Sequence, residues 1–270
     1  MHGELASPQA YIDQITRRHN DLRVLDAGCG ARLSFELPPT AKLTGIDISE
    51  ESARRNERID EVIIGDLQSY KLPPRNYSII TCCDVLEHLP RPDLALLSLF
   101  EAVNDDGIII LALPNVFSLK GLVTKLTPHR FHVWILRTFL NYRNAGKPGF
   151  APFPTFLRTS IAPRHLLKFC DAHQMQPVYF QLYEGSAVRQ LRERSPLAFK
   201  LYALIVRILN GIFLGTHDFG LTDMRLVLRR STAVAIDRTS EGGTLNPTID
   251  RHSAEVYDTK KAQHGAVLAP

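Results

Sequence analysis

The sequence predicts an α/β fold built on a mostly parallel sheet of seven strands with helices on both faces. Through the first 115 residues, short runs rich in Val, Ile and Leu alternate with segments of helical character. This alternation is typical of strand–helix–strand units, which place successive strands parallel in one sheet. Similar strand signals return after residue 170. The predicted strands are Arg23–Ala27, Lys42–Asp47, Glu61–Gly65, Tyr77–Cys83, Gly107–Leu113, Val178–Tyr183 and Met224–Leu228.

Helices are predicted between these strands. The segment Ser49–Arg58 opens on a serine and has Glu50 and Glu51 in its first turn. A side-chain oxygen can cap a helix there, and acidic groups favour its positive end. Asp93–Val103 and the region around Pro163–His173 are the other helices expected between strands.

Composition divides the chain into four parts. Residues 1–115 carry the strand–helix alternation. Residues 116–162 begin with helical character and then become rich in Pro, Gly and aromatic residues, which is typical of an inserted lid. Residues 163–230 return to the alternation. Residues 231–270 show no apolar periodicity, which predicts a disordered tail.

Bulk properties indicate an ordinary globular protein in a reducing compartment. The chain has 270 residues, 44% hydrophobic and 22% charged, which is enough for one large core. Cys29, Cys82, Cys83 and Cys170 form neither a zinc-binding CxxC pair nor an evenly spaced disulfide framework. The first segment contains acids and no apolar run, so no secretory signal is expected. These features predict a cytoplasmic protein without a metal site.

Charge is distributed unevenly along the chain. Residues 1–106 hold 11 basic and 18 acidic residues, whereas residues 107–217 hold 14 and 3. Between Gly107 and Cys170 there are nine basic residues and no acid. Such an excess favours an anionic partner: a phosphate-bearing substrate, an acidic membrane surface or nucleic acid. A solvated basic face is the simpler alternative.

The apolar segment Leu197–Leu214 approaches the length of a membrane span. Lys200 and Arg207 lie inside it, and each cation at mid-bilayer would cost roughly 2.5 to 3.5 kcal/mol on insertion scales. On a helical wheel these cations share one narrow face with Ala203 and Asn210. The pattern favours an amphipathic helix lying on a membrane surface. Packing within the protein or in a homodimer, and true insertion, are the alternatives.

The first predicted strand runs into a glycine turn, within the stretch RVLDAGCGARLSFELPP. A strand, a glycine turn and a helix form the common nucleotide-binding element of α/β folds, because the ligand can approach the backbone amides. A dinucleotide fold would use a third glycine, but Leu33 stands where it would follow Gly28 and Gly30. Asp26 suits a ligand with a cationic amino group. We expect the chain to leave the turn as a short helix that ends at the two prolines.

Four motifs in this order, VLDAGCG, LTGIDIS, IIGDL and CCDVLEHL, resemble the successive motifs of class I S-adenosylmethionine-dependent methyltransferases. They are similar above all to the group that includes the ubiquinone-biosynthesis O-methyltransferases. The resemblance covers residues 20–115, returns weakly over 160–230 and leaves the predicted lid unmatched. It implies a Rossmann-like fold and S-adenosyl-L-methionine as the cofactor.

The resemblance also implies a cofactor site. Asp26, Gly28 and Gly30 would surround the methionine part of the cofactor. Asp47 would accept hydrogen bonds from both ribose hydroxyls, since one carboxylate can take two donors. Ile48, the next residue, is assigned to the same site.

Two later motifs complete the implied site. Asp66 would face the adenine amino group, and Leu67 would pack against the edge of the ring. Cys83, mainly through its backbone, and Asp84 would line the cofactor from the fourth strand. For the acids of the site, the alternative is a structural role as a helix cap or a solvated loop residue.

Three histidines are candidates for a catalytic base. Methyl transfer needs the nucleophile, the methyl carbon and the leaving sulfur in line, and a base helps when the nucleophile is a hydroxyl. The candidates are His88, in the motif LEHL, and His129 and His132, in the predicted lid. The alternative is a capping or pocket-lining role for His88 and a helix-surface position for the other two.

The sequence thus predicts methyl transfer to an oxygen, with nitrogen as second choice, of a small, amphipathic or lipid-linked acceptor. Two other functions stay open: a nicotinamide-dependent oxidoreductase on a similar fold, and a methyltransferase-like protein that is non-catalytic or co-opted for another reaction. Nucleic acid is not the expected partner, because no NPPY-type tetrapeptide for flipped bases occurs and Leu113–Asn115, LPN, is a poor substitute.

Overall fold

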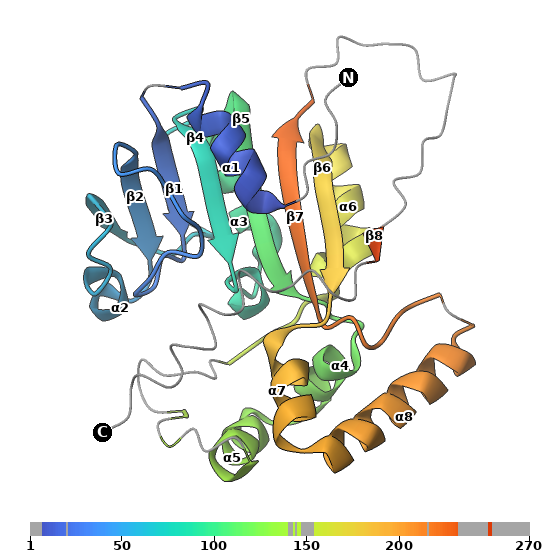
Figure 1. Ribbon diagram of the computed structural model, residues 1–270. Coiled ribbons are helices and arrows are strands. Elements are labelled where there is room, and N and C mark those ends of the chain that lie inside the picture. Colours follow the sequence, from blue (N-terminus) through green and yellow to red (C-terminus); the bar gives the residue numbers. More distant parts are fainter. Residues whose placement is uncertain are drawn as a thin grey trace, which may run out of the picture.

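A single sheet of eight strands, in the order β3-β2-β1-β4-β5-β7-β6-β8, runs through the molecule (Figure 1). The computed structural model describes residues 7–19, 21–139, 143, 145–146, 154–214, 216–231 and 248–249. The strands are β1 (Arg23–Ala27), β2 (Lys42–Asp47), β3 (Glu61–Ile64), β4 (Tyr77–Cys83), β5 (Val103–Pro114), β6 (Met175–Tyr183), β7 (Asp223–Arg230) and β8 (Thr248–Ile249).

Strands β1 to β7 form the predicted mostly parallel sheet, and all seven predicted strands are confirmed within a few residues at their ends. The first five strands are parallel to one another. Strand β7 is antiparallel to both β5 and β6. The two-residue β8 is an addition: it pairs with Gln181 and Leu182 of β6. It lies in the segment 231–270, which was expected to be disordered and otherwise falls almost entirely outside the described residues.

Helices cover both faces of the sheet (Figure 1). The helix α1 packs on one face, while α3 and α6 pack on the other. The helices are α1 (Pro8–Thr16), α2 (Glu50–Arg54), α3 (Pro92–Ala102), α4 (Leu119–Leu126), α5 (His129–Phe139), α6 (Pro163–Ala172), α7 (Ser186–Arg194) and α8 (Pro196–Ile212), with single 3₁₀ turns at Leu86–His88 and Thr159–Ile161.

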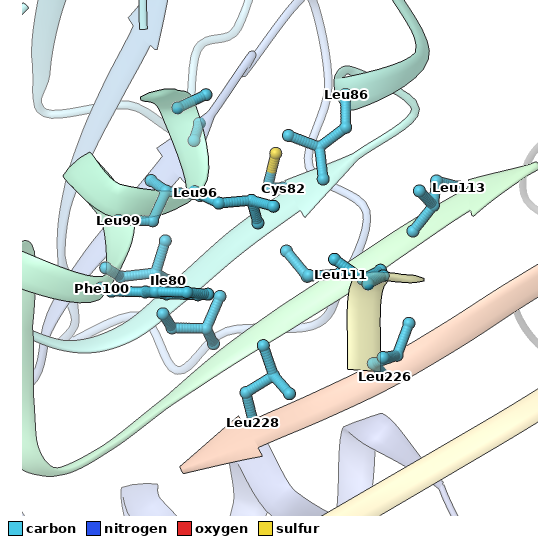
Figure 2. Packing of buried hydrophobic residues seen from close by; sticks show 14 of the residues in the cluster. Ile80, Cys82, Leu86, Leu96, Leu99, Phe100, Leu111, Leu113, Leu226 and Leu228 are labelled. Atoms are coloured by element: carbon cyan, nitrogen blue, oxygen red, sulfur yellow. The ribbon is translucent and has the colours of Figure 1, made fainter. Parts of the chain in front are cut away.

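The central strands are buried on both faces, as a parallel sheet between two helical layers requires. In β4, Ile79 belongs to the cluster on the α1 side, whereas Ile80 belongs to the cluster on the α3 side. Figure 2 shows this second cluster, in which Leu99 and Phe100 of α3 lie near Ile80. Cys82 is fully part of that core, as expected for a small buried residue. This packing on both faces fixes the position of the central strands, and the candidate functional site lies at their carboxyl ends.

Two local expectations are wrong. The short helix expected after the glycine turn is not present: residues 28–41 form turns and bends instead. Leu33, Phe35 and Leu37 pack against the α1-side core at every second position, a spacing that suits extended chain and not a helix. The helix expected at Ser49–Arg58 ends at Arg54. The chain turns after it, and the Asn56 amide donates to the Cys29 carbonyl at 3.4 Å.

A turn after β5 directs the chain into the segment predicted as a lid. The Asn115 side chain donates to the Leu221 carbonyl at 2.8 Å and accepts from the Phe117 amide at 3.1 Å. These contacts occupy the Asn115 side chain, which the LPN motif would otherwise offer to a flipped nucleic-acid base. Figure 1 shows α4, α5, α7 and α8 gathered beyond the edge of the sheet at which the parallel strands end.

Candidate active site

The glycine turn after β1 is fixed between β2 and the loop that follows β4. Gly28 and Gly30 have φ values of +75° and +48°, in the left-handed region that favours glycine. The Gly28 amide donates to the Ile46 carbonyl at 2.7 Å. A Cβ at Gly28 would lie 2.2 Å from Val85 Cγ2, so any side chain here would displace the loop after β4.

Asp47 connects this turn to α2. Its Oδ2 accepts from the Gly30 amide at 2.9 Å and its Oδ1 from the Ser49 amide at 2.8 Å. Each carboxylate oxygen keeps a further lone pair, so the group can still receive two hydroxyl donors. Ile48 beside it is 77% exposed, which offers apolar surface to a ligand that binds on the turn.

Asp26 is a buried carboxylate beneath the glycine turn. It accepts a hydrogen bond from Thr81 Oγ1 at 2.6 Å. Burial raises the pKa of Asp26 to about 6, the Thr81 hydrogen bond lowers it in part, and the charge of Asp47 raises it further. A ligand ammonium group beside Asp26 would favour its ionised form.

The sheet topology brings these residues together. From β1, the order leads to β2 on one side and to β4 on the other. At such a reversal, the carboxyl ends of two adjacent strands open a crevice in which α/β folds bind ligands. Asp26, Gly28, Gly30 and Asp47 all lie at the carboxyl ends of β1 and β2.

Asp66 and Leu67, predicted to meet the adenine ring, follow β3. The Asp66 carboxylate accepts from the Gln68 amide at 2.9 Å and from Gln68 Nε2 at 2.9 and 3.1 Å. Gln68 Oε1 in turn accepts from the Arg91 amide at 2.9 Å. Leu67 is buried in the core cluster on the α3 side. Asp66 thus has a structural role in its loop, and its contact with adenine stays a prediction, as does that of Leu67.

Cys83 and Asp84 end β4 and begin the loop beside the glycine turn. Cys83 is half-buried, unlike its core neighbour Cys82, whose pKa burial raises well above the usual value. Asp84 has φ +55°, an uncommon conformation for aspartate, and its amide donates to the Ala112 carbonyl at 2.8 Å. This strained backbone turns the chain from the strand into the site.

A cavity opens at the same edge of the sheet and shares Asp84 with the cofactor loop. Lys120 Nζ lies 3.2 and 3.4 Å from the two carboxylate oxygens of Asp223, the first residue of β7. Because β7 runs antiparallel, its start meets the ends of β5 and β6 here. The cavity is lined by Asp84, Glu87, Ala112, Pro114, Lys120, Gly121, Thr124, Thr155, Leu157, Tyr183, Gly185, Ser186 and Asp223.

The described lining contains no histidine. His88 lies behind it: its Nδ1 is 2.7 Å from the Pro154 carbonyl and its Nε2 is 3.9 Å from Glu87 Oε1. A carbonyl only accepts, so Nδ1 carries the proton and Nε2 faces the glutamate. His129 is half-buried at the start of α5, and His132 lies in α5 with its side chain outside the described residues.

Sequence reasoning missed four lining residues: Glu87, Lys120, Tyr183 and Asp223. Glu87 lies inside the quoted motif CCDVLEHL, between Asp84 and His88, so the motif contained its signal. The other three come from three distant parts of the chain, and nothing in their local sequence brings them together. Within the described residues, no group of three or more His, Cys, Asp or Glu side chains could hold a metal ion.

Comparisons with known proteins agree with this geometry. A family model described as a methyltransferase domain matches residues 4–146, more than half of the chain. The ubiquinone biosynthesis O-methyltransferase of Nitrosomonas europaea is 27% identical over 117 residues, which cover 39% of this chain and 49% of that protein. The mitochondrial ubiquinone biosynthesis O-methyltransferase of Schizosaccharomyces pombe is 31% identical over 129 residues, covering 42% and 47%.

The matched part of the chain spans about half the length of these two relatives. Among solved structures, a SAM-dependent methyltransferase from Archaeoglobus fulgidus aligns over 83% of this chain and 95% of that one, with 17% identity and a TM-score of 0.46.

The chain belongs to the methyltransferase domain family. Its family is that of the class I S-adenosylmethionine-dependent methyltransferases, whose cofactor is S-adenosyl-L-methionine. The residues fit this cofactor: the buried Asp26 carboxylate suits its amino group, the open lone pairs of Asp47 suit its ribose, and exposed Ile48 offers apolar surface beside them. The missing helix after the glycine turn disfavours a nicotinamide dinucleotide, whose pyrophosphate binds a helix N-terminus.

Substituting Asp47 should weaken cofactor binding selectively. Asp47→Ala removes two charged acceptor positions, so the Kd for S-adenosylmethionine should rise by a factor on the order of 10². Isothermal titration calorimetry measures it. Asp60→Ala is the matched control, because Asp60 also accepts a backbone amide of β2, that of Leu43 at 2.7 Å, but at the opposite end of the strand. Unchanged binding in Asp47→Ala would show that the ribose contact is assigned wrongly.

Asp26 should make both stability and cofactor affinity depend on pH. Its raised pKa means that its contribution to stability is full below about pH 4 and is lost as the pH rises through 6. Asp26→Asn should therefore raise the unfolding free energy of the cofactor-free protein at pH 8 by up to about 3 kcal/mol, and by little at pH 4.

Cofactor affinity should change in the opposite sense. In the parent protein it should fall as the pH drops through 6, whereas Asp26→Asn should bind weakly at every pH. Urea denaturation and calorimetry across this range provide both readouts, with exposed Asp21→Asn as control. A variant that binds as tightly as the parent would contradict the ammonium contact.

Proposed function

We propose that the protein methylates a hydroxyl oxygen of a small, amphipathic acceptor bound in the cavity. The observation that carries this proposal is that the predicted cofactor site and the cavity share a residue. Asp84 belongs to the loop assigned to the cofactor and also lines the cavity, together with Glu87, Lys120 and Asp223. When bound, S-adenosylmethionine supplies an electrophilic methyl group. The protein must then orient the acceptor, exclude water and take up the hydroxyl proton.

Glu87 is the proposed proton acceptor. It is 4% exposed and lines the cavity, and its backbone carbonyl accepts from the Phe156 amide at 2.8 Å and the Leu157 amide at 3.2 Å. His88 Nε2 lies 3.9 Å from Glu87 Oε1. His88 Nδ1 donates to the Pro154 carbonyl, which is two residues before Phe156 in the same segment. Methyl transfer would release the cofactor as S-adenosylhomocysteine, and the hydroxyl proton of the acceptor would pass to the Glu87 carboxylate. In this proposal His88 positions the segment and Glu87.

Lys120 and Asp223 orient the acceptor on the opposite wall. The Asp223 carboxylate accepts from Lys120 and, at 2.5 Å, from Thr222 Oγ1, so its place is fixed. A Cβ at Gly185 would lie 1.9 Å from Asp223 Oδ2, so any side chain there would displace the Asp223 carboxylate. These groups can bind the polar end of an acceptor.

An apolar part of the acceptor is supported by the surroundings of the cavity. Two relatives are named for ubiquinone biosynthesis, which supports a lipid-like acceptor by analogy. Ser186 of α7 lines the cavity, and the next helix, α8, exposes aliphatic side chains. Together with the excess of basic residues in 107–217, these exposed aliphatic side chains favour an enzyme that acts at an anionic membrane surface. A homodimer through α8 is the alternative.

A matched set of acceptors tests the reaction. The protein is incubated with S-adenosylmethionine labelled in its methyl group and with 4-octylphenol, 4-octylaniline, 4-octylthiophenol or unsubstituted phenol. Labelled methyl ether should form fastest from 4-octylphenol and slowly from phenol. Faster labelling of the aniline would replace oxygen with nitrogen as the acceptor atom, and equal rates for both phenols would contradict an amphipathic acceptor.

Replacing Glu87 should remove the base and leave the cofactor site intact. In Glu87→Gln, kcat should fall by roughly 10²-fold or more with the cofactor Kd unchanged. The decline of kcat at low pH, measured at saturating cofactor, should disappear as well, because the carboxylate that would accept the hydroxyl proton is gone. Asp223→Asn is the comparison, and it should raise KM more than it lowers kcat. A variant Glu87→Gln with the parent pH profile would show that Glu87 is not the base.

A further inference from the structure

Helix α8 carries an aliphatic stripe that the described protein leaves uncovered. None of its residues is buried. The stripe repeats at helical spacing, so its members share one face. Their side chains are between 38% and 81% exposed. The stripe consists of Leu197, Leu201, Leu204, Ile205, Ile208 and Ile212.

The opposite face of α8 is held against the protein, which fixes the direction of the stripe. Phe199, Tyr202, Val206 and Leu209 on that face are half-buried. Asn210 donates to Asp218 Oδ1 at 3.2 Å and accepts from the Phe219 amide at 3.0 Å. The stripe therefore points away from the described molecule.

Basic side chains border the stripe. Lys200 and Arg207 are exposed and lie four residues before and three residues after Leu204, so they line one edge of the stripe on the helix surface. Across residues 186–214 there are five basic residues and one acidic residue. Lysine and arginine can keep their alkyl stems on apolar surface while their charged heads reach outward.

We infer that α8 docks the enzyme on an anionic lipid bilayer, with the stripe in the interface and Lys200 and Arg207 at the headgroup phosphates. The inference rests on the proposed function, because it names the surface from which an amphipathic acceptor enters the site. A second copy of the chain fits less well, since it would bring the same positive charge against itself. No helix in the described part of the chain has the length and apolarity to cross a bilayer. The inner face of α8 packs against the protein while its outer face is aliphatic, which suits a helix lying in the plane of the bilayer surface.

The fold places this surface next to the cavity. Helices α7 and α8 are consecutive and meet at Ser195. Figure 1 shows α8 at the same end of the molecule as α4 and α7, beyond the carboxyl ends of the parallel strands. Residues of α4 and α7, Lys120 and Ser186 among them, line the cavity. An enzyme docked through α8 would hold its acceptor site close to the lipid.

Vesicle flotation of the full chain tests the inference. The probes are vesicles of phosphatidylcholine alone and vesicles with about one third phosphatidylglycerol, at low and high salt. The parent protein should float with the anionic vesicles at low salt and much less in the other arms. Leu204→Glu with Ile208→Glu should lower the partition coefficient by a factor on the order of 10². Lys200→Gln with Arg207→Gln should remove the preference for anionic lipid.

The control is Leu94→Glu, the same change at an exposed leucine of α3, which should float like the parent. Cofactor titration of each variant shows that it is folded. Flotation of Leu204→Glu/Ile208→Glu at the parent level, or failure of the parent to float, would overturn the inference. A parent dimer in analytical ultracentrifugation that this variant dissociates would assign α8 to self-association instead. Flotation without methylation of 4-octylphenol would refute the proposed acceptor and leave the docking surface standing.

Discussion

The carboxylate of Asp47 is the contact on which the cofactor half of the site depends. It lies at the end of β2 and receives the amides of Gly30 and Ser49, so one side chain fixes both the glycine turn and the start of α2. Two backbone segments from different strands are thereby held at one carboxylate, which still has lone pairs for a ligand. The packing of Gly28 against Val85 extends this to the loop after β4.

Function and stability oppose each other at Asp26. A carboxylate under the turn can receive a cationic ligand, but burial without that ligand disfavours its charge and raises its pKa to about 6. The Thr81 hydroxyl offsets only part of this cost. Sites that bind charge commonly carry such a conflict, because the group that the ligand needs is one that the empty fold would stabilise better as a neutral residue.

The second half of the site depends on reversed chain direction in the sheet. If β7 ran parallel to β5, Asp223 would lie at the far edge; because it runs antiparallel, the carboxylate meets Lys120 beside the ends of β4 and β5. The same arrangement puts α7 and α8 beyond this edge. The cavity is thus lined by residues far apart in the chain, whereas the predicted cofactor site comes from one continuous run of strands.

The strands could be predicted from the sequence because apolar runs such as Tyr77–Cys83 are buried on both faces and need no partner to be recognised. The turn glycines and Asp26 could be located because left-handed backbone and strand ends leave a local signature. The path of the chain after the turn could not be predicted, because Leu33, Phe35 and Leu37 are stabilised by packing against a core that other segments form. For the same reason the sequence could not indicate that Glu87 and Asp223 line one cavity. The assignment of a histidine as the base stays a prediction.

The sequence by itself determined the sheet and the amphipathic nature of Leu197–Leu214, because local periodicity carries these properties, and it indicated the cofactor through the resemblance of its four motifs to known methyltransferases. Only the tertiary structure decided which side chains share the acceptor cavity and which face of that helix stays uncovered. Both depend on contacts between distant segments, and no local pattern records them.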